Sequence, residues 1–442
     1  MTATCFAVVT LALFAQAAPA PQDASKLDRR IDPAKVTTLP TPQTEEAARR
    51  SAAPPEAVHR IARSAAAVPT DDATFEAARE SLRRGLAYLA KSQTARGTWF
   101  DQVEVAPTDM EPRKRAASVA VTALAFKAFA QADALADADA RTRARNAIDA
   151  VLADAKSLEA VTNGGIGNYV MSAVASGLAA AGDPDAKAGA ARAIAWLRDG
   201  QWDDGEGLDA AQDWYGGAGY GNGKRPDLSN TQMMLDAMHD AGVSPDDPAM
   251  QRALAFVERT QNRKASNSAP WAQQGAGDGG FVYSPANGGE SFASDAAGEG
   301  RYGEKLAVRS LRSYGSMTYA GFKSMLYAGL SQDDPRVKDA LGWIARHFTF
   351  DENPGLGQQG RLYYLHAMAR ALHASRLDRV TDADGRARDW RKELVAALVA
   401  MQREDGSWKN AVERWEESNE DLATVYAVLA LEEALKPSST AE

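Results

Sequence analysis

The sequence predicts an all-α protein, an (α/α)6 toroid in which six helical hairpins close into an inner and an outer ring of helices. Three observations support this fold class. Apolar residues recur at helical spacing along residues 71–437. A two-helix unit repeats along this stretch, and the second helix of each unit is more apolar than the first. An inner ring enclosed by an outer ring requires that difference, whereas an open solenoid is the alternative for such hairpins.

The first twenty residues are typical of a cleaved secretory signal. Residues 6–15 form an apolar stretch of about ten residues, too short to span a bilayer, and Ala-x-Ala patterns follow it. No Lys or Arg precedes this stretch, which departs from the usual signal pattern. We expect residues 1–20 to be a signal peptide and the protein to be secreted or periplasmic, with no transmembrane span. Cys5, the one cysteine, would leave with the signal, so the mature chain would have no thiol nucleophile.

Residues 21–70 have the composition of a disordered Pro/Ala-rich linker. They hold seven of the 19 prolines and no Phe, Trp or Tyr. Such a stretch cannot bury enough apolar surface to offset its ordering entropy. The repeat domain is therefore expected to cover residues 71–437, with residues 438–442 as a short tail.

The first hairpin shows the two kinds of helix. A first helix is expected from Thr74 to about Gln93, followed by Gly97, a residue suited to a left-handed cap. Its apolar residues share one face: Phe75, Ala78, Leu82, Leu86 and Leu89. The second helix, from about Ser118, is apolar nearly all round, which predicts that it is buried.

The same unit recurs along the chain. First helices share an Arg, an aromatic residue four positions later, an aliphatic residue next to it, and a Gln four positions after that, as in the segment ending at Gln93. Copies end at Gln201 and Gln261, and weaker ones near Phe348 and Gln402. A period near 54 residues predicts one more first helix within residues 141–158. Second helices are expected to begin near Ser118, Asn168, Ser229, Ser316, Arg361 and Asp421.

Loops that join a first helix to a second helix are rich in glycine and aromatic residues. They lie at residues 164–169, 214–221, 278–283 and 353–360. All of them must lie at the same end of the ring, because each joins an outer helix to an inner one. Each loop alone is explained as turn chemistry, but four together suggest the mouth of a pocket.

Charge and metal-ligand patterns exclude several classes of function. The net charge is −9 and no basic cluster stands out, so a nucleic-acid partner is not expected. The five histidines lack metal-ligand spacing, and the calcium-like stretch at Asp382 has Arg391 where a glutamate ligand is needed. We therefore expect no metal and no cofactor, and a simple turn at Asp382.

Two segments resemble a known repeat. The spacing of Arg84, Tyr88, Gln93, Gly97 and Trp99 looks like the full Gln–Trp repeat of squalene and hopene cyclases. A shorter copy contains Gln402, Gly406 and Trp408. The chain thus resembles the prenyltransferase and squalene-oxidase repeat family, whose fold is the α/α toroid. The resemblance implies that each Gln bonds backbone groups at helix ends and that each Trp is buried between neighbouring hairpins.

The resemblance does not carry over the family's catalytic residues. The cyclases protonate an alkene with an Asp-x-Asp-Asp-Thr motif, and the best match here runs from Asp227 to Thr231. Ser229 and Asn230 replace the second and third acidic residues, so we expect no cyclisation of squalene. Asp227 is equally well explained as a helix N-cap that the helix dipole keeps ionised. The zinc ligands of protein prenyltransferases align with Arg312, Tyr314 and Ala423, so a zinc thiolate site is rejected.

Candidate site residues remain on the inner helices and the loops. The candidate catalytic residues are Asp227, His366 and Asp421. The candidate ligand-binding residues are aromatic: Trp214, Tyr215, Trp271, Tyr314, Tyr319, Tyr364 and Trp415. His366 is also explained as a hydrogen-bonded core histidine.

Three classes of function remain open, and only some of them are enzymes. The first is a cyclase-like or prenyltransferase-like protein that holds an apolar or isoprenoid ligand in its central cavity. The second is a secreted carbohydrate-active lyase or hydrolase, in which rim aromatics stack on sugars. The third is a non-catalytic binding or scaffold protein, because fold does not fix function. An apolar, closed cavity lining would favour isoprenoids, and a polar, open lining would favour saccharides.

Overall fold

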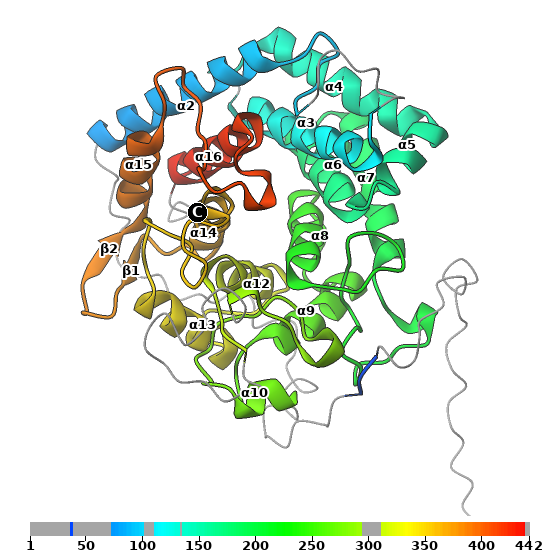
Figure 1. The fold of residues 1–442 in the computed structure, drawn as a ribbon, viewed down its shortest axis with the longest axis vertical. Coiled ribbons are helices and arrows are strands. Elements are labelled where there is room, and N and C mark those ends of the chain that lie inside the picture. Colours follow the sequence, from blue (N-terminus) through cyan, green and yellow to red (C-terminus); the bar gives the residue numbers. More distant parts are fainter. Residues whose placement is uncertain (1–35, 39–71, 101–109, 133–134, 294–310, 438–442) are drawn as a thin grey trace, which may run out of the picture.

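The computed structural model describes residues 36–38, 72–100, 110–132, 135–293 and 311–437, which fold as two concentric rings of helices (Figure 1). The inner helices are α3 (Pro112–Ala132), α6 (Gly167–Ala181), α8 (Leu228–Asp240), α12 (Gly315–Tyr327), α14 (Arg361–Ala374) and α16 (Glu420–Leu435). The outer helices are α2 (Asp72–Ser92), α4 (Ala138–Ala153), α7 (Pro184–Gly200), α9 (Pro248–Thr260), α13 (Pro335–Arg346) and α15 (Trp390–Met401).

The ring is closed. Each inner helix packs on the next along the chain, and the last one, α16, packs on α14, α3 and α2. Helix α15 also contacts α2, which joins the two ends of the outer ring. The (α/α)6 toroid is therefore confirmed, and the open solenoid is wrong. Helix α4 supplies the outer helix that the period predicted between the first two sharp copies.

Short elements connect the rings. Helices α5 (Ala155–Thr162) and α10 (Pro270–Gln274) and three 3₁₀ turns, η4 (Asp204–Glu206), η5 (Ala286–Gly288) and η6 (Arg414–Glu416), lie in the loops. A hairpin of β1 (Arg379–Thr381) and β2 (Ala387–Asp389) joins α14 to α15, with Val380 opposite Arg388. The Asp382 carboxylate accepts from the backbone of Asp384 and Arg386 inside this hairpin, as the expected turn requires.

Aspartate caps and prolines set the starts of several outer helices. Asp183, Asp247 and Asp334 each accept a hydrogen bond from the first turn of the following helix, which opens with a proline. Helix α3 begins at Pro112, earlier than the expected Ser118, because the Glu111 carboxylate accepts from two backbone N–H groups of its first turn. The first turn of α3 is polar, so the apolar pattern did not show where the helix begins.

A glutamine at the end of an outer helix links neighbouring hairpins in four places. Gln93 Nε2 donates to the carbonyl of Gly97 in its own loop and to that of Ala140 in the next outer helix, at 3.1 and 2.9 Å. Gln201, Gln261 and Gln402 make the same pair of bonds. The expected role of Gln93 and Gln402 is confirmed, and the link recurs where the sequence pattern is weaker.

Trp99 and Trp408 are fully buried, as the repeat implied. Each indole donates to a backbone carbonyl of the preceding outer helix, at 2.8 Å in both copies. The backbone N–H of each tryptophan donates to a threonine hydroxyl on the following inner helix. Gly97 precedes Trp99 with φ 82°, and a Cβ there would lie 2.4 Å from the Arg143 carbonyl oxygen, so only glycine fits.

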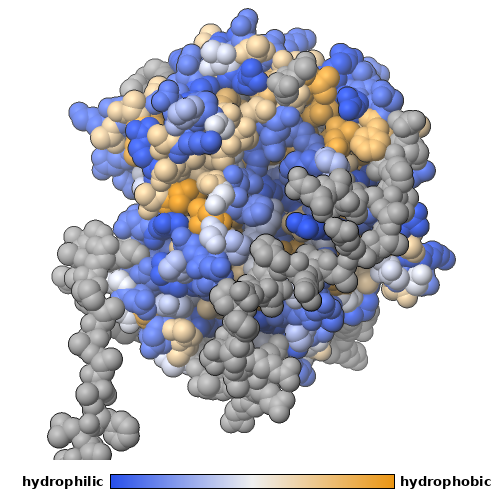
Figure 2. Space-filling model, turned by 180° about the vertical axis from the view of Figure 1, so that it is seen from behind, coloured by the Kyte–Doolittle hydropathy of each residue, from blue (hydrophilic) through white to orange (hydrophobic). Residues whose placement is uncertain are grey.

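Part of the expected linker contacts the ring. Asp213 is fully buried, and its carboxylate accepts the backbone N–H of Thr37 at 2.9 Å. Thr38 forms an isolated antiparallel bridge with Gln212, and Val36 packs on a small cluster containing Trp202 and Trp214. The rest of residues 21–70, the expected signal peptide and the tail lie outside the described residues. Viewed from behind, the surface is mostly hydrophilic, with hydrophobic residues in small patches (Figure 2).

Candidate functional site

Asp227 begins α8 and is almost completely buried. Its Oδ1 accepts the backbone N–H of Asn230 at 2.9 Å, which is the expected N-cap bond. The carboxylate also accepts from two side chains of the same turn, Ser229 Oγ at 2.6 Å and Asn230 Nδ2 at 2.8 Å. Ser229 and Asn230, which replace acidic residues of the cyclase motif, therefore both donate to this carboxylate.

Three tyrosines lie around Asp227. The Tyr169 hydroxyl on α6 donates to Ser229 Oγ at 2.8 Å. Burial and then Asp227 raise the pKa of Tyr283, whose hydroxyl lies 3.0 Å from that of Tyr220. The rings of Tyr169 and Tyr220 are neighbours, with centroids 5.8 Å apart. Tyr169, Ser229, Asp227 and Asn230 thus form one hydrogen-bonded network, and Tyr220 and Tyr283 form a hydrogen-bonded pair beside it.

Two tyrosines from α14 and α16 complete a group that we call the tyrosine cluster: Tyr169, Tyr220, Tyr283, Tyr363 and Tyr426. The Tyr363 and Tyr426 rings are 5.8 Å apart. Tyr363 of α14 accepts from Gln232 of α8, and Tyr169 of α6 donates to Ser229 of α8, although α6 and α14 lie on opposite sides of the inner ring. The cluster therefore faces the ring axis. Four of its members, all but Tyr283, are only half-buried, so solvent reaches them there.

Burial dominates the ionisation of this network. Loss of solvent raises the pKa of Asp227, although the bonds from Ser229 and Asn230 oppose the shift. The helix-cap bond and burial therefore act on the pKa of Asp227 in opposite directions. Burial, followed by neighbouring phenols and Asp227, also holds the pKa of Tyr169 well above its ordinary value.

Gln232 and His366 lie one helical turn further along the axis. Gln232 Nε2 donates to the Tyr363 hydroxyl at 3.0 Å, which joins α8 to α14. The His366 ring stacks on Tyr426 with centroids 5.7 Å apart. Burial and the nearby Arg370, Lys323 and Lys127 hold the pKa of His366 well below its ordinary value, so the imidazole is neutral.

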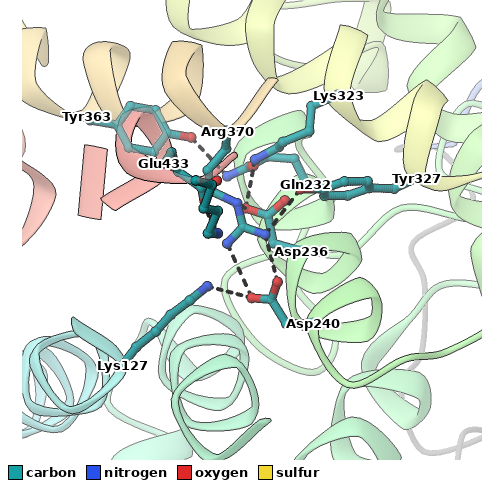
Figure 3. Close-up of polar contacts among 10 residues, drawn as sticks. Lys127, Gln232, Asp236, Asp240, Lys323, Tyr327, Tyr363, Arg370 and Glu433 are labelled. Atoms are coloured by element: carbon teal, nitrogen blue, oxygen red, sulfur yellow. Dashed lines mark hydrogen bonds and ion pairs between the residues drawn. The ribbon is translucent and has the colours of Figure 1, made fainter. Parts of the chain in front are cut away.

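Beyond this level a buried network of charges crosses the axis (Figure 3). We call Lys127, Asp236, Asp240, Lys323 and Arg370 the ionic plug. Lys127 and Arg370 both bind the Asp240 carboxylate, at 2.6 and 2.8 Å, and so connect α3, α8 and α14. Lys323 of α12 binds Asp236 at 2.7 Å and Gln232 at 2.8 Å. The five plug residues lie in the carboxyl halves of their helices, whereas Asp227 and Ser229 lie at the amino end of α8.

The ionic plug shifts the pKa of its own members. Burial raises the pKa of Asp240, but Arg370 and Lys127 outweigh it and leave that pKa well below 3.8. Burial lowers the pKa of Lys323 to about 8, with Asp236 opposing the shift. The three cations and two carboxylates therefore depend on one another for compensation.

Trp415 lies at the rim of the tyrosine cluster. It is one of the exposed large apolar residues, at 39%, and its ring centroid is 5.6 Å from that of Phe292, which in turn lies 4.5 Å from that of Tyr283. The Arg414 guanidinium stacks over both Trp415 and Phe292. Of the aromatic candidates from the sequence, Trp415 is the one whose placement suits ligand contact.

The other aromatic candidates are turned away from the axis or lie within the core. Trp214 and Trp271 are buried in two satellite clusters of the long loops, the first shared with the half-buried Tyr215. Tyr314, Tyr319 and Tyr364 are buried in the main core, and the Tyr364 hydroxyl donates to the Thr349 carbonyl. Burial leaves five of these six residues no free face, and Tyr215 packs beside Trp214 in the loop cluster, so the aromatic candidates do not form one ligand surface.

Asp421 lies in the first turn of α16 and is half-buried. Its Oδ2 accepts the backbone N–H of Phe100 at 3.3 Å. The neighbouring Glu420 is paired with Arg403 and Lys409. The structure thus places Asp227 in the tyrosine cluster, His366 beneath it, and Asp421 against the loop after α2.

Tyr169, Tyr220 and Tyr283 lie in three of the loops that suggested the mouth of a pocket, but none of them was predicted individually as a site residue. The ionic plug was not predicted. A signal was present: each plug residue is a charged side chain in the carboxyl half of a mostly buried inner helix. Within the described residues no group of His, Cys, Asp or Glu could hold a metal, and no helix is long and apolar enough to cross a membrane.

Comparisons with known proteins give distant structural similarity only. No family model and no curated protein match the chain. The type II terpene cyclase MstE from Scytonema, solved with geranylgeranyl dihydroxybenzoate, is 14% identical over 82% of this chain and 98% of its own, with a TM-score of 0.31. A glycosidase variant solved with glucose is 13% identical over 84% and 100%, with a TM-score of 0.44. A protein from Actinoplanes is 13% identical, over 81% and 99%, with a TM-score of 0.31.

Proposed function

We propose that the protein binds a hydroxyl-rich ligand of the saccharide class on the ring axis, against the tyrosine cluster. One observation carries the proposal: four half-buried tyrosines lie together, and an amide and a buried set of charges lie next to them. Tyr169, Tyr220, Tyr363 and Tyr426 are half-buried there, and Gln232 lies beneath them. Aromatic rings stack on sugar faces while hydroxyls and amides bond sugar hydroxyls.

The ionic plug favours the same class of ligand. An isoprenoid gains its binding energy from burial against apolar groups, and the buried charges of the ionic plug give no such gain. A hydroxyl-rich ligand can exchange its water for protein donors and acceptors at the same place. The half-exposed Trp415 and Phe292 then form an aromatic rim beside the tyrosine cluster.

A second candidate is the isoprenoid ligand that the cyclase-like repeats suggest. It is favoured by Val119, Ala120 and Leu124, whose small residual exposures of 7–9% add apolar surface on α3. The two candidates differ in an observable way. A saccharide requires the tyrosine hydroxyls, whereas an isoprenoid requires only apolar surface.

Binding of a panel of oligosaccharides and of polyprenyl lipids tests the proposal directly. We expect the protein to bind saccharides, and Tyr363→Ala to weaken binding about tenfold or more by removing a ring and a hydroxyl from the axis. Tyr88→Ala, a half-buried tyrosine on outer helix α2, is the control and should bind as the wild type does. Binding of squalene or polyprenols without saccharide binding would favour the second candidate instead.

We also propose that the protein is exported, on the apolar stretch and the Ala-x-Ala sites of residues 1–20. Amino-terminal sequencing of the protein from its own host is expected to show a start about 17–20 residues after Met1. An intact Met1 on protein from the cytoplasmic fraction would contradict this proposal.

A further inference from the structure

We propose that the loops after α7 and α10 form a docking site for an extended peptide segment, and that residues 36–38 of the same chain occupy it. We call these three residues the clasp, because they hold the loop that carries Tyr283. Figure 1 shows the clasp in dark blue at the outer edge of the ring, beside the green loops. The inference goes beyond the proposed function, because it concerns how the candidate site is held and does not depend on which ligand binds.

The clasp is recognised through its backbone. Asp213 binds both backbone groups of Thr37: its carboxylate accepts the Thr37 N–H at 2.9 Å, and its own N–H donates to the Thr37 carbonyl at 3.0 Å. Thr38 continues the pairing as an antiparallel bridge with Gln212. Thr37 and Thr38 are themselves exposed. The contact therefore selects an extended backbone, as in the addition of a strand to a sheet edge, rather than these two side chains.

One apolar side chain adds to the backbone contact. Val36 is half-buried and packs on a cluster of four buried residues from the two loops: Trp202, Leu208, Trp214 and Ala286. All three clasp residues are β-branched, which favours extended backbone. The composition of the clasp thus suits the conformation in which it docks.

The docking surface is held from the side of the ring. Arg259 of α9 donates to the carbonyls of Ala210 and Tyr215, on either side of the residues that bind the clasp. The Trp202 and Trp214 rings meet edge to face with centroids 5.1 Å apart. The clasp instead belongs to a separate part of the chain, since residues 39–71 lie between it and α2. Its docking is intramolecular, so a few contacts are enough to keep the surface occupied.

Asp213 connects the clasp to the loop at residues 283–290. This aspartate is fully buried, and its two oxygens accept from different segments: Oδ1 from Thr37, and Oδ2 from the Asn287 N–H at 3.2 Å. Asn287 has φ 58°, which is uncommon for a residue other than glycine. Ala286 beside it belongs to the cluster on which Val36 packs. Loss of the clasp would therefore take a donor from the carboxylate that holds Asn287 and an apolar neighbour from Ala286.

The other end of this loop meets the candidate site. The Tyr283 carbonyl accepts the backbone N–H of Leu228, the first residue of α8, at 2.7 Å. The Tyr283 hydroxyl lies 3.0 Å from that of Tyr220 in the tyrosine cluster. Ser284 Oγ donates to the Pro226 carbonyl at 2.8 Å, directly before Asp227. The loop thus joins the docked clasp to the first turn of α8 and to the tyrosine cluster.

Hydrogen exchange of the whole protein, measured by mass spectrometry, tests the clasp. Thr37→Pro removes the N–H that Asp213 accepts, whereas Thr37→Ala keeps it and is the matched control. We expect Thr37→Pro to speed amide exchange at Asp213, Asn287 and Leu228 by about tenfold or more, as the loss of a hydrogen bond to a charged group implies. Thr37→Ala should exchange as the wild type does. Amides in the middle of α12 and α14 should be unchanged in both variants.

The pattern of exchange decides between the outcomes. Faster exchange at Asp213 alone would mean that the segment docks but does not hold the loop, and this would overturn the proposal. So would wild-type exchange in Thr37→Pro, or equal changes in the two Thr37 variants. Lost protection in α12 and α14 as well would mean that the ring itself depends on residues 36–38, which contradicts a separate clasp.

A second variant tests the apolar contact with less disturbance of the backbone. Val36→Ser keeps the hydrogen bonds of Thr37 and should speed exchange at the same amides by a smaller factor than Thr37→Pro. Unchanged exchange in Val36→Ser would overturn the role of the apolar contact. None of these measurements needs a ligand, so a failure of saccharide binding and a failure of the clasp are distinguishable.

Discussion

Replacing Asp240 with asparagine is expected to lower the free energy of unfolding by roughly 3 to 5 kcal/mol. Asparagine has the same shape, so the variant creates no cavity. It removes the charge that Lys127 and Arg370 share at 2.6 and 2.8 Å, and both cations are almost fully buried. Urea denaturation at neutral pH measures the loss.

The effect of Asp240→Asn should depend on pH. Because the pKa of Asp240 is held below its ordinary value of 3.8 in the folded protein, its stabilisation is complete above that value and is lost as the pH falls further. The difference between the two proteins is therefore expected to be constant near neutrality and to shrink below about pH 4. Glu80→Gln breaks an exposed pair with Arg83 and should leave the denaturation midpoint unchanged. An equally small effect of Asp240→Asn would contradict the role of the ionic plug.

Trp99→Ala is expected to cost about 3 to 5 kcal/mol of stability, as large core truncations do. The indole is fully buried, stacks on Phe129 with centroids 5.9 Å apart, and donates to the Leu89 carbonyl. The change therefore leaves a cavity between two hairpins and removes one of the donors to the Leu89 carbonyl. Thermal and urea denaturation should both detect it.

Trp415→Ala is the matched control for Trp99→Ala, because it removes the same side chain from an exposed position. With 39% of its surface exposed, Trp415 should contribute less than about 1 kcal/mol. Equal losses in the two variants would mean that Trp99 does not join neighbouring hairpins.

The repeat pattern predicted the toroid because its signals are local. Gln93, Gly97 and Trp99 lie within seven positions of one another, and each position has a geometric reason: a carbonyl clamp, a positive φ and a buried ring. The contrast between apolar second helices and amphipathic first helices then fixed which ring each belongs to. The start of α3 was missed because a glutamate, rather than a strong capping residue, begins it.

The site was predicted less well because it is assembled from distant residues. Tyr169 meets Ser229 only when α6 and α8 pack side by side, and Gln232 meets Tyr363 across the inner ring. The loop sequences gave no signal of which aromatic side chains reach the axis. Trp214 and Trp271 occur in the same kind of segment as Tyr220, yet they fold back onto satellite clusters. Periodicity places residues on a helix, but it does not tell which loop side chains return to the axis.

The substitutions in the acidic motif gain a physical explanation. With Ser229 and Asn230 beside it, Asp227 accepts several hydrogen bonds, so it is a proton acceptor rather than a strong acid. Protonation of an alkene requires the opposite property. That the protein does not cyclise squalene stays a prediction.

The central claim is that a saccharide binds on the ring axis against the tyrosine cluster. A crystal structure of the protein with the oligosaccharide that binds best in the panel tests this claim most directly. The account predicts sugar density between α6, α8 and α14, in contact with Tyr169, Tyr220 or Tyr363. Sugar density on the outer loops beside Trp214 or Trp271, with the axis empty, would contradict it.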